Sequence, residues 1–331
     1  MKGYRVLVCS AGTSPALGIV KCYRWLVGGT NHIVTTDLVA DVGGSIYSDK
    51  HYVVPQYSSP QYFPALQEII QKERIQVVYP THLDEILYLS QLGEGLPKWY
   101  RELAVLNPPE MVLSANNKPA MNSLWEQSGG LLPKAFDSVS DVKDSDFPVI
   151  AKPPNGASRG YENIYRIDNR AVLEAFEDRI AGMLIQQCVI GTEHSIDFVA
   201  ESGTLVCVCA RTRSRVEGGL SVSGTTVSAK EFMDVVEITL KVLPQIGFGN
   251  IQIMRDESRR DYLIEINPKL PGTLIHSAAA GLNMPLILAD MKLGNAIQPV
   301  SVASGLHMMR YHDEMFWSNN SSRWALRDSL R

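Results

Sequence analysis

The sequence contains few cysteines and no long apolar run. Its five cysteines form no Cys-x-x-Cys pair, and reduced, buried thiols are their expected state. No stretch approaches the roughly 20 apolar residues of a membrane-spanning helix. The first apolar run has the length of a strand and leads directly into turn residues, unlike a signal peptide. We therefore expect a soluble, cytoplasmic protein with no membrane partner.

An excess of positive charge is also missing. The chain has 31 lysines and arginines against 35 acidic residues, so its formal net charge is −4. No global positive field favours nucleic acid or an anionic membrane, and any anion site must be built locally. With 45% apolar and 20% charged residues, the composition is that of a globular protein and too apolar for a disordered one. A length of 331 residues allows more than one domain.

The N-terminal part alternates strand-like and helix-like segments. The strand-like runs lie at 4–10, 32–37 and 75–80, and the helix-like runs at 17–26, 62–73 and 83–92. This alternation predicts a parallel sheet covered by helices, in which ligands bind at the carboxyl ends of the strands. Beyond Pro109 the pattern changes: a helical stretch, short strands around a glycine-containing loop, and long strands around one helix predict an α+β half.

The segment "DYLIEINPKLPGT" has the most informative pattern. Strand alternation places Glu265 and Asn267 on one face. A hairpin through "ESRR" would bring Gln252 opposite them. Three oxygen ligands of this kind suit Mg²⁺, which binds a few protein oxygens together with water and phosphate. Lys269 could then face a phosphoryl group, although a solvated strand face is the simpler alternative.

The loop in "VIAKPPNGASRG" is typical of a phosphate-binding loop. Lys152 ends an apolar strand, and Ser158, Arg159 and Gly160 lie in the loop that follows. Glycines let backbone amides approach phosphate oxygens, while lysine and arginine supply positive charge. A plain hairpin loop with solvated basic residues is the alternative. The P-loop motif is excluded, because no Gly-Lys-Ser/Thr follows.

A third signal is the strand and turn in "LIQQCVIGTEH". The backbone near Gln187 and Val189 could hold a purine, and Glu193 beyond the glycine could reach ribose hydroxyls. An ordinary strand followed by an exposed acid is the alternative. Each signal is weak alone, and their order along the chain, with Lys118 on a helix before them, strengthens them together.

In this order the motifs resemble the ATP-grasp superfamily, most closely the short relatives of the carbamoyl phosphate synthase large subunit. The resemblance implies an α/β plus α+β fold: a Rossmann-like domain at 1–113 and an ATP-grasp domain of two α+β subdomains at 114–310. The smaller lid subdomain would lie at about 147–190, and 311–331 would form a tail. Relatives are often dimers, so the resemblance makes a homodimer one candidate assembly, and the sequence leaves the oligomeric state open.

The resemblance also implies roles for individual residues. The expected contacts to ATP are Lys118, Lys152, Ser158, Arg159, Gly160, Gln187, Val189 and Glu193. The expected Mg²⁺ ligands are Gln252, Glu265 and Asn267, and Lys269 would lie beside the γ-phosphate. Two residues depart from the usual pattern: Gln187 replaces a common glutamate, and Lys269 replaces a common arginine and lacks its bidentate fork.

The substrate region is expected in "CARTRSRVEGG". Arg211, Arg213 and Arg215 alternate, so in an extended chain they would share a face suited to a carboxylate. A solvated strand edge is the alternative. Within the resemblance, Arg211 is the expected catalytic arginine, and the roles of Arg213 and Arg215 stay open. His276 could line the same cleft or be a structurally satisfied histidine.

The resemblance implies an ATP- and Mg²⁺-dependent ligase that joins a small-molecule carboxylate to an amine through an acyl phosphate. A second hypothesis is an ATP-binding regulatory or partner subunit without turnover. A third is an NAD(P)-dependent oxidoreductase using "VLVCSAGTSPALG" and Asp37. The third is opposed by the sequence, because Gly12 and Gly18 lack the Gly-x-Gly-x-x-Gly spacing. Asp84 and Glu85 are interpreted as first-turn acids favoured by a helix dipole.

Overall fold

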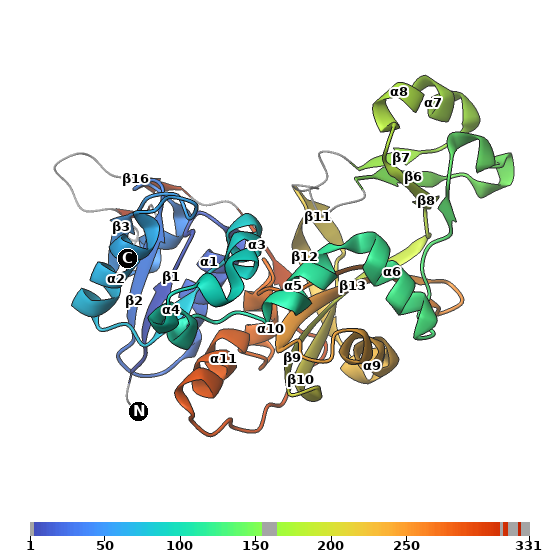
Figure 1. Ribbon diagram of the computed structural model, residues 1–331. Helices are drawn as coiled ribbons and strands as arrows, with labels where there is room; N and C mark the ends of the chain where they lie inside the picture. Colours follow the sequence, from blue (N-terminus) through green and yellow to red (C-terminus); the bar gives the residue numbers. More distant parts are fainter. Residues whose placement is uncertain (1–2, 154–163, 312–313, 317–323, 326–331) are drawn as a thin grey trace.

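The computed structural model describes residues 3–153, 164–311, 314–316 and, for the backbone alone, 324–325. Figure 1 shows a parallel sheet at the N-terminal side, a long antiparallel sheet beside it, and a small sheet with α7 and α8 that projects away from both. The predicted order of a parallel α/β part followed by an α+β part is confirmed.

The N-terminal unit contains a four-stranded parallel sheet of order β3-β2-β1-β4. Its strands are β1 (Arg5–Val8), β2 (His32–Asp37), β3 (Lys50–Val53) and β4 (Val77–Tyr79). Its helices are α1 (Ser14–Lys21), the π-helical turn η1 (Cys22–Leu26), α2 (Tyr62–Glu73), α3 (Leu83–Leu92) and α4 (Lys98–Leu103). The last three residues of β1 are fully buried, because helices cover both faces of the sheet.

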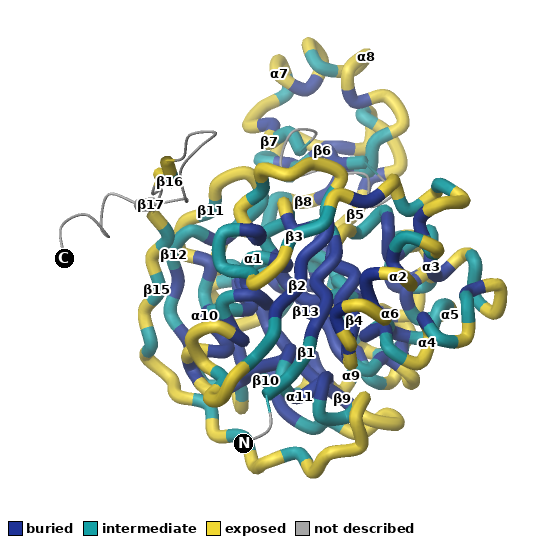
Figure 2. The backbone as a smooth tube through the Cα atoms, turned by 90° about the vertical axis from the view of Figure 1, so that its left-hand side faces the viewer, coloured by how far each residue is buried: buried dark blue, intermediate teal, exposed yellow. Residues whose placement is uncertain are grey.

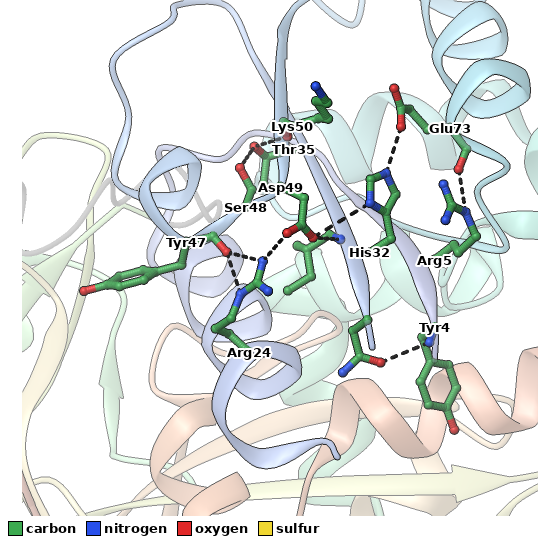
Figure 3. A network of polar contacts seen from close by, with 12 residues as sticks. Tyr4, Arg5, Arg24, His32, Thr35, Tyr47, Ser48, Asp49, Lys50 and Glu73 are labelled. Carbon is green, nitrogen blue, oxygen red and sulfur yellow. Dashed lines mark hydrogen bonds and ion pairs between the residues drawn. The ribbon is translucent and has the colours of Figure 1, made fainter. Parts of the chain in front are cut away.

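A polar network fastens the β2–β3 edge of this sheet (Figure 3). Asp49 accepts a hydrogen bond from the backbone of Ile33 at 2.7 Å and pairs with Arg24 at 2.9 Å. Glu73 accepts hydrogen bonds from Tyr52 at 2.6 Å and from His32 at 2.8 Å. These two contacts, that of Tyr52 first, lower the pKa of the Glu73 carboxyl. The network joins β2 and β3 to the neighbouring helices, which is a structural role.

The second part begins with α5 (Pro109–Asn116) and α6 (Lys118–Gln127). The small sheet has the order β5-β8-β6-β7. Its elements are β5 (Ala135–Phe136), β6 (Val149–Lys152), β7 (Tyr165–Ile167), α7 (Arg170–Ala175), α8 (Glu177–Ile180) and β8 (Leu184–Gln187). Short 3-10 turns lie at Gly43–Tyr47, Gly93–Gly95, Val139–Asp141, Asp144–Asp146 and Ala229–Phe232.

The large sheet has the order β11-β12-β10-β9-β13-β14, and β15 pairs with β12. Its strands are β9 (Gly191–Glu201), β10 (Thr204–Thr212), β11 (Arg215–Glu217), β12 (Leu220–Val227), β13 (Phe248–Asp256), β14 (Asp261–Asn267) and β15 (His307–Met309). The helices are α9 (Met233–Val242), α10 (Leu274–Ala279) and α11 (Met284–Leu293), and β16 (Met315–Phe316) pairs with β17 (Trp324–Ala325).

One hydrophobic core joins the N-terminal unit to the C-terminal helices. It contains Val6 and Tyr79 from the parallel sheet together with Leu274 of α10 and Ile287 of α11. Tyr79 donates a hydrogen bond to the carbonyl of Pro285 at 2.7 Å. Figure 2 shows buried backbone in the interior, around β1 and β13, with exposed backbone around it. The shared core fixes the carboxyl edge of the parallel sheet relative to the large sheet.

Asn107 fixes the end of β14 from the connection between the two parts. It is buried, and its amide nitrogen donates to the carbonyls of Phe248 and Pro268 at 2.9 Å each. Its amide oxygen accepts from the backbone of Gly247 and Phe248 at 2.7 and 3.2 Å. All these groups are buried or nearly so, and such bonds are costly to lose. Asn107 therefore sets the backbone between Asn267 and Lys269.

Candidate functional site

A cavity of about 480 Å³ lies where the N-terminal unit, helices α5 and α6, and the β13–β14 hairpin meet. The N-terminal unit contributes the connection from β4 to α3, and the large sheet contributes the end of β14 and the turn before β12. Of the residues singled out from the sequence, those lining it are Lys118, Glu193, Arg213, Gln252, Glu265, Asn267 and Lys269.

The β13–β14 hairpin supplies the oxygen-rich wall of the cavity. Gln252 lies opposite Glu265, as predicted for a hairpin through 257–260, whereas the residue opposite Asn267 is Asn250. Asn267 donates from its amide nitrogen to Glu265 at 2.8 Å, and Gln252 donates to Asn250 at 3.4 Å. These bonds orient the side-chain amides of Asn267 and Gln252. Their amide oxygens and the Glu265 carboxylate are hard ligands of the kind that Mg²⁺ prefers.

Three lysines come from separate elements around this wall. Lys118 begins α6, Lys152 ends β6, and Lys269 follows β14. Burial, together with the charge of Lys118, lowers the pKa of Lys152 to about 8, although Glu265 opposes the shift. Burial also lowers the pKa of Lys269, again opposed by Glu265. Desolvated cations around a single carboxylate favour the binding of an anion that carries several charges.

Glu193 and Arg213 form an ion pair at the cavity wall. Their side chains are 3.0 Å apart and only 17% and 5% exposed. The pKa of the Glu193 carboxyl is raised, mainly by burial. The positive charge of Arg213 opposes this shift, and the negative charge of Glu265 adds to it. Arg213 also donates to the carbonyl of Gly219 at 2.9 Å, while its buried Nε has no acceptor within the described part of the chain. An unsatisfied donor of this kind is typical of a site that binds a further group.

Arg211 has a different environment from the one expected. Its side chain is fully buried and forms a bidentate ion pair with Asp197, at 2.9 Å to both oxygens. It also donates to Thr273 and Ser277. Arg211 does not line the cavity, so this geometry gives it a positioning role.

The prediction that three alternating arginines share one substrate face is wrong. Strand β10 ends at Thr212, so the extended chain assumed for the prediction does not continue to Arg215. Arg215 begins β11, is 70% exposed and pairs with Glu217. Arg213 alone among the three lines the cavity. His276 corresponds to the structural alternative, since its Nε2 lies 2.9 Å from the carbonyl of Leu306.

The predicted adenine contacts lie in another hollow of about 520 Å³. Gln187 and Val189 line it together with residues of the β13–β14 turn. The backbone amide of Gln187 donates to the carbonyl of Lys134 at 2.7 Å, and that of Cys188 to Pro148 at 3.1 Å. The predicted phosphate loop, with Ser158, Arg159 and Gly160, lies outside the described residues.

Two cavity residues were missed as site residues by the sequence analysis. His82 lies in the connection from β4 to α3 and Asp84 in the first turn of α3, and both line the cavity. Asp84 is in the first turn of α3, which is what the helix-dipole interpretation required. The signal that could have identified both residues is their place at the carboxyl end of a parallel strand.

No three His, Cys, Asp or Glu side chains among the described residues gather as a metal cluster, so a metal at Glu265 would depend on amide and phosphate oxygens. Among the helices described, none combines the length and the apolar character that crossing a bilayer requires.

Two families match the chain in sequence. The family described as "ATP-grasp in the biosynthetic pathway with Ter operon" matches residues 179–314, and the family described as "PylC-like, N-terminal domain" matches residues 6–97. A curated relative, the carbamoyl phosphate synthase large chain of Thermotoga neapolitana, is 22% identical over 293 residues. That match covers 80% of this chain and 26% of the relative, so the chain spans about a quarter of its length.

Two solved structures share the fold over most of the chain. The biotin carboxylase of Campylobacter jejuni has a TM-score of 0.65 at 15% identity, covering 90% of this chain and 73% of that protein. The N5-carboxyaminoimidazole synthetase of Staphylococcus aureus, solved with ADP, has a TM-score of 0.66 at 13% identity. That likeness covers 93% of this chain and 82% of the synthetase. At these identities, the likeness concerns the fold alone.

Proposed function

We propose that this chain, of which residues 179–314 match an ATP-grasp family, is an ATP- and Mg²⁺-dependent ligase joining a small-molecule carboxylate to an amine. The observation that carries the proposal is the convergence of Lys118, Lys269, Glu265 and Asn267 on one cavity. Cations and hard oxygen ligands side by side are what a magnesium–polyphosphate substrate requires.

The positive charges at the cavity indicate which residues would bind the nucleotide. Lys118 and Lys152 would hold the phosphates of ATP, with Lys269 beside the γ-phosphate. The donor set of Gln252, Glu265 and Asn267 fits Mg²⁺, since all three offer oxygen and Glu265 adds one negative charge. When bound, the metal would neutralise the phosphate oxygens. The protein would contribute position and positive charge, which is most of what phosphoryl transfer requires.

The reaction would proceed in two displacements. A carboxylate oxygen of the first substrate attacks the γ-phosphorus of ATP, and the bond to ADP breaks. The amine nitrogen then attacks the acyl carbon, and phosphate leaves. We propose Arg213, in place of Arg211, as the residue that holds the carboxylate, because Arg213 lines the cavity and Arg211 is enclosed with Asp197.

The alternatives are weakened by different features. Asp37, which an NAD(P) enzyme would use for ribose, accepts a hydrogen bond from the backbone of Gly12 at 2.8 Å and so belongs to the turn itself. A regulatory subunit without turnover would keep the same cations, and an activity measurement separates it from a ligase.

The proposed function is tested by ADP release. With Mg²⁺ and ATP, we expect release to rise at least about tenfold over the background with one member of a panel of amino acids and dicarboxylates, tested singly and in pairs. The increase is expected because a bound carboxylate supplies the attacking oxygen. A coupled assay with the Glu265→Gln variant as control gives the measurement. ATP binding without stimulated release by any pair would instead support the regulatory subunit.

The pKa of Lys152 predicts a pH dependence. Because this pKa is lowered to about 8, the charge of Lys152 is present below that pH and lost above it. We expect kcat/KM for ATP to fall as the pH rises through about 8, by up to about tenfold per pH unit. Initial rates at subsaturating ATP give the profile. Lys152→Arg is the control, since arginine stays protonated, and an unchanged fall in that variant would contradict the assignment.

A further inference from the structure

Arg310, directly after β15, is a half-buried cation without a counter-charge. Its guanidinium donates to the carbonyl of Gly272 at 2.5 Å. Within the described part of the chain it forms no ion pair, and its buried Nε has no acceptor. A buried donor is costly to leave unpaired, so this side chain is suited to a group that the chain itself does not supply.

The charges that act on Arg310 are positive. Its pKa is lowered by burial and by the charge of Arg211. The pKa of Lys21 is in turn lowered by burial and by the charge of Arg310. Arg211 is already balanced by Asp197, so the missing counter-charge is that of Arg310. An anion from outside the chain would both balance this charge and accept from its Nε.

Arg310 lies on the face of the large sheet that carries the proposed metal ligands. Gln252 on β13 begins a row of directly opposed residues that continues through Ser195, Arg211 and Thr226. Val222, four residues before Thr226 on β12, accepts from the backbone amide of Arg310 at 2.7 Å and so lies opposite it. Opposed residues share a face, as do residues an even number apart on one strand. Arg310 is therefore on the face of Gln252, with β9, β10 and β12 between them.

The loop after β14 joins Arg310 to the cavity wall. This loop carries Lys269, which lines the cavity, and Gly272, which binds Arg310. Gly272 packs against Leu220, another residue of the wall: a Cβ added to Gly272 would lie 2.6 Å from the Leu220 side chain. Along the sheet, the proposed metal ligands on β13 and β14 come first, Arg213 at the end of β10 follows, and Arg310 after β15 is last. A molecule held by Arg310 would lie beyond the carboxylate substrate as seen from ATP.

We propose that Arg310 binds the carboxylate of the second substrate, and that this substrate is an amino acid that reacts through its amino group. This inference rests on the proposed ligase function. The guanidinium pairs with the carboxylate and directs the amine toward the acyl carbon. The C–N bond then forms, the bond from the acyl carbon to the phosphate oxygen breaks, and the protons of the ammonium group leave with solvent.

The subsite is tested by comparing each amino acid with the amine that lacks its carboxylate, such as alanine with ethylamine or lysine with cadaverine. With ATP and the carboxylate that stimulates ADP release, we expect wild-type kcat/KM for the preferred amino acid to exceed that for its amine about 10- to 100-fold. Arg310→Gln should lower the value for the amino acid by a similar factor and leave that for the amine within about threefold. Arg310→Lys should recover part of the preference, and Arg101→Gln, an exposed arginine on α4, should behave as wild type.

Hydroxylamine separates the subsite from the ligase function, because it has no carboxylate and captures acyl phosphates as hydroxamates. Wild type and Arg310→Gln should form hydroxamate at rates within about threefold. Equal losses with amino acid and amine in Arg310→Gln, or no preference in the wild type, would overturn the subsite and leave the ligase function standing. Slower hydroxamate formation in Arg310→Gln alone would place Arg310 at the carboxylate substrate and also overturn the subsite. Absence of hydroxamate and of stimulated ADP release with both proteins would overturn the ligase function, and the subsite with it.

Discussion

Glu265→Gln is expected to lower kcat for ADP release by about 100- to 1,000-fold. Glu265 is the single formal negative charge in the proposed metal set, and it lies among three lysines. Glutamine keeps the shape and still offers an oxygen to Asn267, whose hydrogen bond is 2.8 Å long in the wild type. The substitution therefore removes charge with little change in packing, and the proposed Mg²⁺ site would lose its one negatively charged protein ligand.

The measurement is kcat at saturating ATP over a range of Mg²⁺ concentrations. The apparent Mg²⁺ requirement should rise in the variant, because amide oxygens alone bind this ion weakly. Glu201→Gln, an exposed acid at the end of β9, serves as the matched control and should leave kcat unchanged. A Glu265→Gln enzyme within about threefold of wild type at every Mg²⁺ concentration would remove Glu265 from the proposed machinery.

Asp197→Ala is expected to lower the free energy of unfolding by about 3–5 kcal/mol. Asp197 and Arg211 are both fully buried, and Asp197 also accepts from Asn250 at 2.6 Å and from Ser277 at 2.5 Å. Removing the carboxylate leaves the guanidinium of Arg211 buried without its counter-charge. Denaturant unfolding of the wild type and the variant measures the difference.

A double substitution tests the cause of this loss. Replacing both partners, as Asp197→Leu with Arg211→Met, removes both charges and should be less destabilising than Asp197→Ala alone. Exposed Asp178→Ala is the control, and it should change stability by less than about 0.5 kcal/mol. A loss below about 1 kcal/mol for Asp197→Ala would contradict the structural role of the pair.

Much of the fold and part of the site follow from short-range patterns. The alternation of strands and helices up to residue 92 predicted the parallel sheet, because amphipathic periodicity reflects burial on one face or both. Glu265 and Asn267 share a face because alternation is a property of any strand. Gln252 lies opposite Glu265 because a short turn joins two adjacent strands and sets their register.

The arginines show where such patterns stop. Arg211 and Arg213 are two residues apart and look equivalent in the sequence. Arg211 is enclosed because α10, more than sixty residues further along the chain, brings Ser277 against it. Arg213 lies beyond the end of β10, where the cavity begins. No local pattern distinguishes the two arginines.

Asp84 makes the same point for a cavity residue that the sequence did not identify. In the sequence it is an acid in the first turn of a helix, and the structure agrees with that description. Its place in the cavity depends on the packing of the parallel sheet against α10 and α11, which sets the end of β4 facing the end of β14. Periodicity acts over a few residues, whereas the enclosure of a charge depends on which distant segments cover it, and this chain brings those segments together only when it folds.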